Sequence, residues 1–355
     1  MAQASRPGAA GPPGRRAVWN TRRVTTDTQP RKRHTGRWIA VGIVGVIVLA
    51  LLAAIGWYFL RVNPSLQQVE TIETAFPEES LRPTVEPVEG NAPVNVLLLG
   101  SDSRATDGSL LTGLGDRADT ILVAHIPPDR ETLQIMSIMR DSWVEIPGHP
   151  GMRKVNAALA LGGVPLMVQT VEGIIDQRID HVAVIDFEGF KGLTTALGGV
   201  TLQNDIAFSE GAYSFPAGEI TVEGDAALAY VRARYPFSDG DYQRAHNQRA
   251  LLRGAIEQLM TRENLTNPDR LADIFATVSP HMAMTDTLSL PVGVQLATQM
   301  AQLDSSRVQT FTMPTLGTGM EGSQSVVYVN WDGVEQIREA FDAESMTSFQ
   351  PAPER

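Results

Sequence analysis

The stretch Val94-Asn-Val-Leu-Leu-Leu-Gly-Ser-Asp-Ser-Arg104 indicates the fold of this chain most directly. Its apolar run is typical of a buried β-strand that stops at Gly100. Asp102 and Arg104 follow soon after the end of that run. Open α/β sheets place ligand sites at such strand ends, so both side chains are candidates for binding a ligand. A single aspartate at a strand end is more often a turn or cap residue, and that alternative stays open.

A second segment, Gly115-Asp-Arg-Ala-Asp-Thr120, places charges at the beginning of a strand instead of its end. Arg117 and Asp119 stand just before another strand-like run, Ile121–Ile126. Hard divalent cations prefer carboxylate ligands, and the guanidinium fork of arginine matches phosphates. We expect the two strands to be neighbours, so that their acids and arginines meet in one site for an anionic ligand.

Two later segments carry the same residue types to the ends of predicted elements. The strand-like run Ser137-Ile-Met-Arg-Asp141 ends in Arg140 and Asp141. The helical pattern over about 222–234 carries Arg232 and Arg234 in its last turn.

The longest helical pattern, about 241–261, offers a further row of polar side chains. Asp241, Arg244 and Gln248 stand at positions i, i+3 and i+7, so they share one face of the predicted helix. An exposed charged face is the commoner explanation of such a row. Five segments nevertheless bring Arg or Asp to element ends in an acidic domain, and this convergence favours one anionic ligand. The pattern does not assign a role to His246 on the same helix.

The first 60 residues differ in composition from the rest of the chain. Residues 1–37 hold nine Lys or Arg and one acid and show no apolar periodicity, so we predict a disordered basic tail. Residues 38–60 carry no charge and are long enough to span a bilayer as one helix. Because basic flanks stay cytoplasmic, we expect a single-pass protein of the cell membrane whose amino terminus is cytoplasmic and whose later residues are extracellular.

The part beyond the predicted span is acidic, because the whole chain has a net charge of −11 despite its basic tail. This balance argues against nucleic acid as a partner. The chain has no cysteine, so disulfides and thiol chemistry are excluded. No GxSxG elbow, HExxH helix or P-loop lysine motif competes with the arginine and aspartate segments. We expect a Pro-rich spacer over 61–93, a catalytic domain over 94–345 and a flexible tail over 346–355.

Strand-like and helical patterns alternate within the predicted domain. Strands are expected at 94–99, 120–126, 133–138, 181–187 and about 308–312. Helices are expected at about 156–175, 188–198, 222–234, 241–261, 266–277, 287–302 and 331–343. This alternation indicates an α/β or α+β layered fold over a mostly buried sheet.

Six segments in this order resemble the LytR–CpsA–Psr family of membrane-anchored cell-wall phosphotransferases. They are NVLLLGSDSR, DRADT, SIMRDSWVEIPG, KVNAALALGG, IDHVAVIDFEGFKGLTTALGGV and ALAYVRARYPFSDGDYQRAHNQR. The resemblance covers roughly residues 94–343 and implies a three-layer α/β/α sandwich around a mostly buried mixed sheet. It also implies a hydrophobic cleft for a polyprenyl chain.

The resemblance assigns roles to individual residues. It implies that Mg²⁺ is held by Asp102 and Asp119. It implies that pyrophosphate is bound by Arg117, Arg140, Arg232, Arg234 and Gln248. Further motif positions that line or support the same site are Arg104, Asp141, Asp241 and Arg244. The chain departs from the family where it has Met139 in place of the usual proline, and at Ala245 and His246, where Gln or Arg is common.

The implied activity is transfer of a glycopolymer from a polyprenyl-pyrophosphate carrier to peptidoglycan, which forms a phosphodiester and releases polyprenyl phosphate. Asp102, Asp141 and Asp241 are all candidates for the general base. Two other hypotheses remain at this point. The protein could hydrolyse the lipid-linked pyrophosphate with water as acceptor, or it could bind the lipid-linked polymer without catalysis.

Overall fold

The computed structural model describes residues 68–84, 90–101, 109–114, 118–234, 236–237, 241–259, 261, 264, 267–300, 303 and 305–342. All of them belong to one unit of the chain, Ile55–Arg355. The predicted basic tail, membrane span and carboxyl-terminal tail lie outside the described residues. So do three predicted site residues, Asp102, Arg104 and Arg117.

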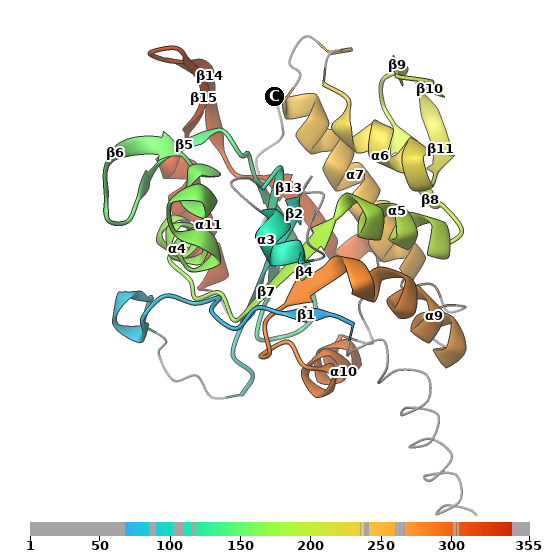
Figure 1. Ribbon diagram of the computed structural model, residues 1–355, viewed down its shortest axis with the longest axis horizontal. Helices are drawn as coiled ribbons and strands as arrows, with labels where there is room; N and C mark the ends of the chain where they lie inside the picture. The colour runs from blue at the N-terminus through green and yellow to red at the C-terminus, as the bar shows by residue number, and fades with distance from the viewer. Residues whose placement is uncertain are drawn as a thin grey trace, which may run out of the picture. The chain divides into compact units, whose positions relative to one another are not determined.

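A seven-stranded mixed sheet forms the centre of the domain (Figure 1). Its strands, from edge to edge, are β1 (Glu70–Thr71), β12 (Met282–Met284), β7 (His181–Asp186), β2 (Val94–Ser101), β3 (Thr120–Ile126), β4 (Leu133–Ile138) and β13 (Val308–Thr312). β2 pairs in parallel with β7 and antiparallel with β3, as the neighbouring strand runs predicted. The five expected strands are all present, so the prediction of a mixed α/β fold is confirmed.

The two faces of the sheet pack against different helices. Leu97 and Leu99 of β2 belong to a cluster that includes residues of α4 (Ala157–Ile175) and α11 (Trp331–Phe341). Leu122 of β3, facing the opposite way, belongs to a cluster that includes side chains of α7 (Asp241–Leu259). Because successive side chains of a strand alternate between faces, one strand supplies residues to both layers. The sheet therefore lies between helices on both sides (Figure 1).

Helix α4 is buried and interrupted near its beginning. Gly162 and Gly163 leave the helical conformation, and Gly163 has φ +65°, which few other residues adopt without strain. Among the described helices α4 alone is long and apolar enough to cross a membrane, but 56% of that window is buried inside the domain. We interpret α4 as a core helix.

A second group of helices surrounds its own apolar cluster beside the main sheet. It comprises α5 (Phe187–Ala196), α6 (Gly224–Arg232), α7 and α9 (Pro268–Val278), with the small hairpins β8 (Val200–Asn204), β9 (Phe208–Glu210), β10 (Tyr213–Phe215) and β11 (Gly218–Val222). Tyr230 of α6 is almost fully buried at its centre. The helices were predicted from sequence, and the hairpins between α5 and α6 were not.

A separate four-stranded sheet lies on the side of the domain away from α5, α6 and α9 (Figure 1). Its order is β14 (Thr315–Glu321), β15 (Gln324–Val329), β5 (Ser142–Ile146) and β6 (His149–Lys154). The remaining elements are α3 (Leu110–Leu114), α10 (Leu290–Gln299) and the 3₁₀ turns η2 (Glu79–Leu81), η3 (Ser279–His281) and η4 (Ser305–Arg307).

Part of the expected spacer packs onto the domain. β1 pairs in parallel with β12, and Ile72 and Ala75 are buried in the main core. Arg82 donates from Nε and Nη2 to Glu172 Oε1 of α4, over 3.0 and 2.6 Å, and both side chains are buried. Residues 68–84 of the expected spacer thus contribute a strand, core residues and a buried ion pair to the domain.

His125 of β3 is fully buried on the α11 side of the sheet. Its Nδ1 lies 2.7 Å from Oδ1 of Asn95, and its ring stacks on Phe341 with centroids 4.1 Å apart. Burial lowers the pKa of His125 from 6.5 to about 3, because the charged imidazolium loses its hydration there.

This burial predicts a loss of stability on acidification. Between pH 6.5 and about 3 the unfolded chain binds a proton at His125 that the folded chain does not, so the free energy of unfolding falls as pH falls through this window. Each unit of pKa difference corresponds to about 1.4 kcal/mol, which makes the total on the order of a few kcal/mol. Denaturant unfolding of the His125→Asn variant between pH 7 and pH 4 should show a flatter pH dependence than wild type. His149→Asn, which leaves His125 in place, should keep the wild-type dependence, and an unchanged slope in His125→Asn would contradict the assignment.

Candidate active site

The ends of several strands meet at one edge of the main sheet. β2, β7, β4 and β13 point the same way, and β3 begins at that edge because it is antiparallel to β2 and β4. Gly100 pairs with Thr120 there, and a Cβ on Gly100 would lie only 2.9 Å from Cβ of Thr120. Glycine thus allows β2 and β3 to stay paired up to the edge. In addition, the Asp119 amide donates to the Gly100 carbonyl over 3.0 Å.

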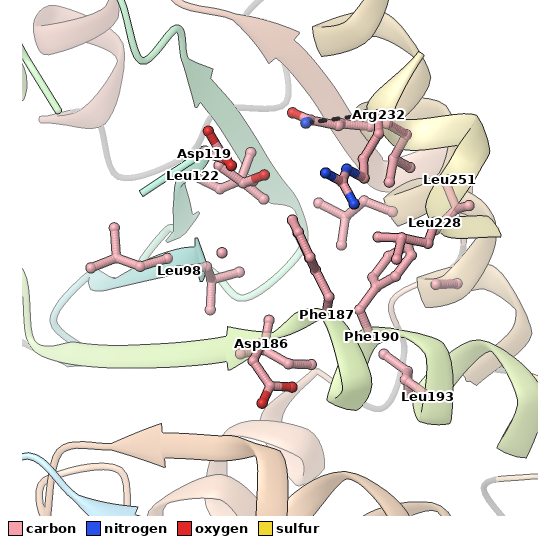
Figure 2. A pocket seen from close by; sticks show the side chains of 18 of the residues that line it. Leu98, Asp119, Leu122, Asp186, Phe187, Phe190, Leu193, Leu228, Arg232 and Leu251 are labelled. Carbon is pink, nitrogen blue, oxygen red and sulfur yellow. Dashed lines mark hydrogen bonds between the residues drawn. The ribbon is translucent and has the colours of Figure 1, made fainter. Parts of the chain in front are cut away.

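A cavity of about 550 Å³ opens at this edge, between the sheet and helices α5, α6 and α7. Most of its wall is apolar. The large apolar side chains that line it include Leu98, Leu122, Phe187, Phe190, Leu193, Leu228, Val231, Leu251, Leu252 and Met282. Figure 2 shows Phe187 and Phe190 projecting from the first turns of α5 into the cavity, with the ring of Phe190 beside Leu228.

The polar residues of the cavity come from five separate segments of the chain. They are Asp119, Arg140, Asp186, Arg232, Arg234, Arg244 and Gln248, together with the small polar residues Thr120 and Thr194. Six of these were predicted from sequence as site residues: Asp119, Arg140, Arg232, Arg234, Arg244 and Gln248. The structure thus brings four arginines to one cavity, although their roles in binding or catalysis stay predictions.

Asp119 and Arg140 form an ion pair, with Arg140 Nη1 donating to Asp119 Oδ1. Both side chains are about a quarter exposed, so the pair is accessible from the cavity. Arg140 Nε also lies 3.9 Å from Oδ2 of Asp141, and Asp141 Oδ1 lies 3.0 Å from Nζ of Lys154. These four residues make a row of alternating charges beside the cavity. Lys154, at the end of β6, was not recognised as part of it from sequence.

Three further residues considered from the sequence have no described side chain among those that line the cavity. Asp141 does not line the cavity, and its carboxylate is bound by Lys154. Asp241 is the first residue of α7, and its side chain is outside the description. His246 faces a different, polar groove, where its Nε2 lies 3.1 Å from Asp205 Oδ2. His246 is therefore not part of the cavity, because it stands two residues from both Arg244 and Gln248, which puts it on another face of the helix.

The start of α5 is fixed by Asp186, the last residue of β7. Asp186 Oδ1 accepts a hydrogen bond from the Gly189 amide over 2.7 Å, and its Oδ2 lies 3.1 Å from His281 Nδ1. Gly189 is closely packed, since a Cβ there would lie 2.6 Å from Cβ of His281. These contacts hold the first turn of α5, and with it Phe187 and Phe190, which line the cavity.

The residues of the cavity can be examined for groups that could bind a metal ion. Within the described part of the chain no group of three or more His, Asp or Glu side chains could hold a metal ion. Asp119 nevertheless presents a carboxylate at the cavity, and Mg²⁺ is commonly held by one or two carboxylates with phosphate oxygens of the substrate. The donor chemistry at Asp119 therefore fits Mg²⁺, with Asp102 as the second predicted carboxylate.

This arrangement suits an amphiphilic anion. The apolar wall can bury a hydrocarbon chain, and charged or polar groups at one end fix the orientation of a head group. Arginine guanidinium groups bind phosphate oxygens with strong, often bidentate hydrogen bonds. A ligand with a lipid tail and a phosphate head uses both halves of the cavity.

The LytR_cpsA_psr family model matches residues 59–342 of the chain. The teichoic acid transferase TagU of Enterococcus faecalis is 34% identical over 250 residues, which cover 70% of this chain and 78% of that protein. The TagU protein of Bacillus subtilis is 30% identical over 247 residues, covering 70% and 78%. Both carry the full name polyisoprenyl-teichoic acid–peptidoglycan teichoic acid transferase.

Solved structures show the same fold. The crystal structure of B. subtilis TagV matches with a TM-score of 0.61 and 25% identity, over 71% of this chain and 97% of that one. The crystal structure of B. subtilis TagU matches with a TM-score of 0.52 and 26% identity, over 70% and 95%. The mixed central sheet is thus shared with proteins of this family.

The cap of α5 can be tested against an equivalent cap elsewhere. Asp186→Ala removes the bond to the Gly189 amide, and Asn330→Ala removes the same kind of bond to the Gly333 amide at the start of α11. Each change should cost about 1 kcal/mol in the free energy of unfolding. Only Asp186→Ala should weaken binding of a fluorescent anilinonaphthalene sulfonate probe to the cavity, because α11 does not line it. Equal probe binding in both variants would show that Asp186 does not shape the cavity.

Proposed function

Because this chain belongs to the LytR–CpsA–Psr family, we propose that it is a phosphotransferase of cell-wall assembly. It transfers a glycopolymer from a polyprenyl-pyrophosphate carrier to peptidoglycan. A phosphodiester forms, and polyprenyl phosphate is released. The curated relatives are named for teichoic acid, and the site residues described here recognise the lipid and the pyrophosphate rather than the polymer.

The observation that carries this proposal is the division of one cavity into an apolar wall and an arginine-lined end. The apolar wall suits the first isoprene units of the carrier, whose burial contributes roughly 0.8 kcal/mol per methylene. The arginines suit the pyrophosphate. Carrier lipid and pyrophosphate are covalently joined, so the two halves of the cavity match the two halves of one substrate.

The proposed reaction is attack by an acceptor hydroxyl of peptidoglycan on the sugar-side phosphorus. The new oxygen–phosphorus bond forms while the bond from that phosphorus to the bridging oxygen breaks, and the bridging oxygen leaves with polyprenyl phosphate. Phosphoryl transfer of this kind depends on positioning and on stabilising negative charge. Arg140, Arg232 and Arg234 supply fixed positive charge for that purpose. Asp102, Asp141 and Asp241 stay candidates for accepting the proton of the acceptor hydroxyl.

Magnesium belongs to this proposal as a cofactor. Asp119 and Asp102 would hold it, and the metal would supply positive charge next to the pyrophosphate oxygens. Arg140, which pairs with Asp119, would bind the same phosphates.

We also propose the membrane arrangement expected from the sequence. One span over residues 38–60 anchors the protein, with the amino terminus in the cytoplasm and the domain outside. Such an anchor places the cavity on the side of the membrane where peptidoglycan is assembled.

The direct test is transfer by the purified full-length protein in detergent. A prenyl-pyrophosphate-linked glycopolymer is supplied with peptidoglycan, and mass analysis follows the polymer. A phosphodiester linkage on peptidoglycan is expected. Release of free polymer with none attached would instead indicate a pyrophosphatase, and binding without turnover would indicate a non-catalytic lipid-linked polymer binder.

The arginine end of the cavity should be sensitive to single changes. Arg140→Ala, Arg232→Ala or Arg234→Ala removes a positioned donor from developing negative charge, and should lower the transfer rate on the order of 10²–10³-fold, as for comparable oxyanion donors. The corresponding Lys variants should recover only part of the rate, because lysine lacks the planar fork. Arg307→Ala is the control, since Arg307 pairs with Glu131 on the surface over 2.8 Å and does not line the cavity. Loss of transfer in the control, or full activity in the cavity variants, would contradict this assignment.

The proposed magnesium ligands should act as a unit. Asp119→Ala and Asp102→Ala should each remove most transfer activity, and the double variant should be little worse than either single one. Calorimetric titration of the protein with Mg²⁺ provides a readout independent of activity, and both variants should lose this binding. Full activity in excess chelator, or losses that simply multiply, would mean that the acids do not share a metal.

A further inference from the structure

The ring of Phe187 lies beside the guanidinium of Arg232. Cζ of Arg232 is 4.9 Å from the centroid of the ring, within the range of a cation–π contact (Figure 2). Phe187 is the first residue of α5 and Arg232 is the last residue of α6, two helices that pack on each other. Both side chains also line the cavity.

Arg232 differs from Arg140 in how its charge is held. Arg140 already donates to Asp119. Over the described ranges of the chain, the guanidinium of Arg232 makes a contact with the Phe187 ring and no hydrogen bond or ion pair. A ring face attracts the cation without occupying any of its N–H donors. The donors of Arg232 therefore stay available for a ligand in the cavity.

From this geometry we infer that Phe187 is a positioning residue for Arg232, and that the pair binds the phosphate attached to the lipid. This inference rests on the proposed function and assigns a role within it. An arginine side chain loses considerable rotamer freedom when it binds a ligand. A ring that already restrains the guanidinium reduces that cost, which is the general benefit of preorganisation.

The position of the ring indicates which phosphate is involved. Phe187 belongs to the apolar wall, together with Leu98, Phe190 and Leu228, and its ring also carries the cation. A lipid tail lying along that wall brings its own phosphate next to Phe187 before the sugar-side phosphate. Arg232 then donates to polyprenyl phosphate, the group that takes the electron pair of the broken phosphorus–oxygen bond.

The helix turn that carries the Phe187 ring is fixed by neighbouring residues. Asp186 caps the first turn of α5 and contacts His281, and Gly189 permits close packing of that turn on the 281 segment. Phe187 is therefore attached to a fixed helix start, which is what a positioning role requires.

The test compares two ligands that differ only in the phosphate, geranylgeranyl monophosphate and geranylgeraniol. Binding of each to full-length protein in detergent is measured by calorimetry. Phe187→Leu shortens the apolar contact for both ligands. Beyond the loss that both ligands share, it should weaken binding of the monophosphate by roughly a further two- to five-fold, the size of an exposed cation–π contact. Phe190→Leu is the matched control, because Phe190 lines the same cavity on the same helix, whereas the cation–π contact of Arg232 is with Phe187. This control variant should weaken binding of both ligands equally.

Two further variants separate positioning from simple packing. Phe187→Trp, which restores an aromatic face, should keep the preference for the monophosphate. In an Arg232→Ala background, Phe187→Leu should weaken binding of both ligands equally, because the cation that contacts the ring is absent. Thermal unfolding of each variant shows whether the fold is retained.

The inference is overturned if Phe187→Leu weakens both ligands equally, or if the extra loss persists without Arg232. Wild-type protein that binds the monophosphate no better than the alcohol would instead contradict the proposed function. The two failures are therefore distinguishable.

Discussion

The pairing of β2 with β7 on one side and β3 on the other is the constraint on which the site depends. It aligns the end of β2, the end of β7 and the beginning of β3 at one edge of the sheet. Asp119 arrives at the beginning of β3, and Phe187 directly follows β7. A slip of one residue in either pairing would turn the side chains of the shifted strand to the opposite face of the sheet, and would displace the site residue attached to that strand. The buried apolar runs of these strands fix the register, and so the core determines the geometry of the site.

Helix α7 completes the site by presenting two different faces. Arg244, Gln248, Leu251, Leu252 and Ala255 follow helical spacing and line the cavity, with the polar residues in the first turns and the apolar ones further along. His246 and Arg253 lie on another face, over the second groove. One helix thus contributes to both the charged end and the apolar wall of the cavity. The change from polar to apolar along the helix matches the change along an amphiphilic ligand.

The sequence allowed the central strands and most helices to be predicted, because continuous apolar runs and helical periodicity are local signals. The strands β5, β6, β14 and β15 were missed. They are short or partly exposed, and β15 joins β5 by a pairing of Val327 with Ser142 that no local pattern reveals. The arginines were found because several segments carried the same residue type to element ends. Phe187 and Phe190 were missed because an apolar residue in a helix is usually core, and only the packing of α5 and α6 shows that these rings line a cavity. The placement of His246 away from the cavity follows from helical spacing alone.

The proposed function requires that one cavity hold both the lipid and the pyrophosphate of a single substrate. A crystal structure of the domain with geranylgeranyl pyrophosphate tests this most directly. We predict the hydrocarbon chain along Leu98, Phe190 and Leu251, with the two phosphates in contact with Arg140, Arg232 and Arg234. A ligand bound with its phosphates away from these arginines, or with its chain outside the cavity, would contradict the account.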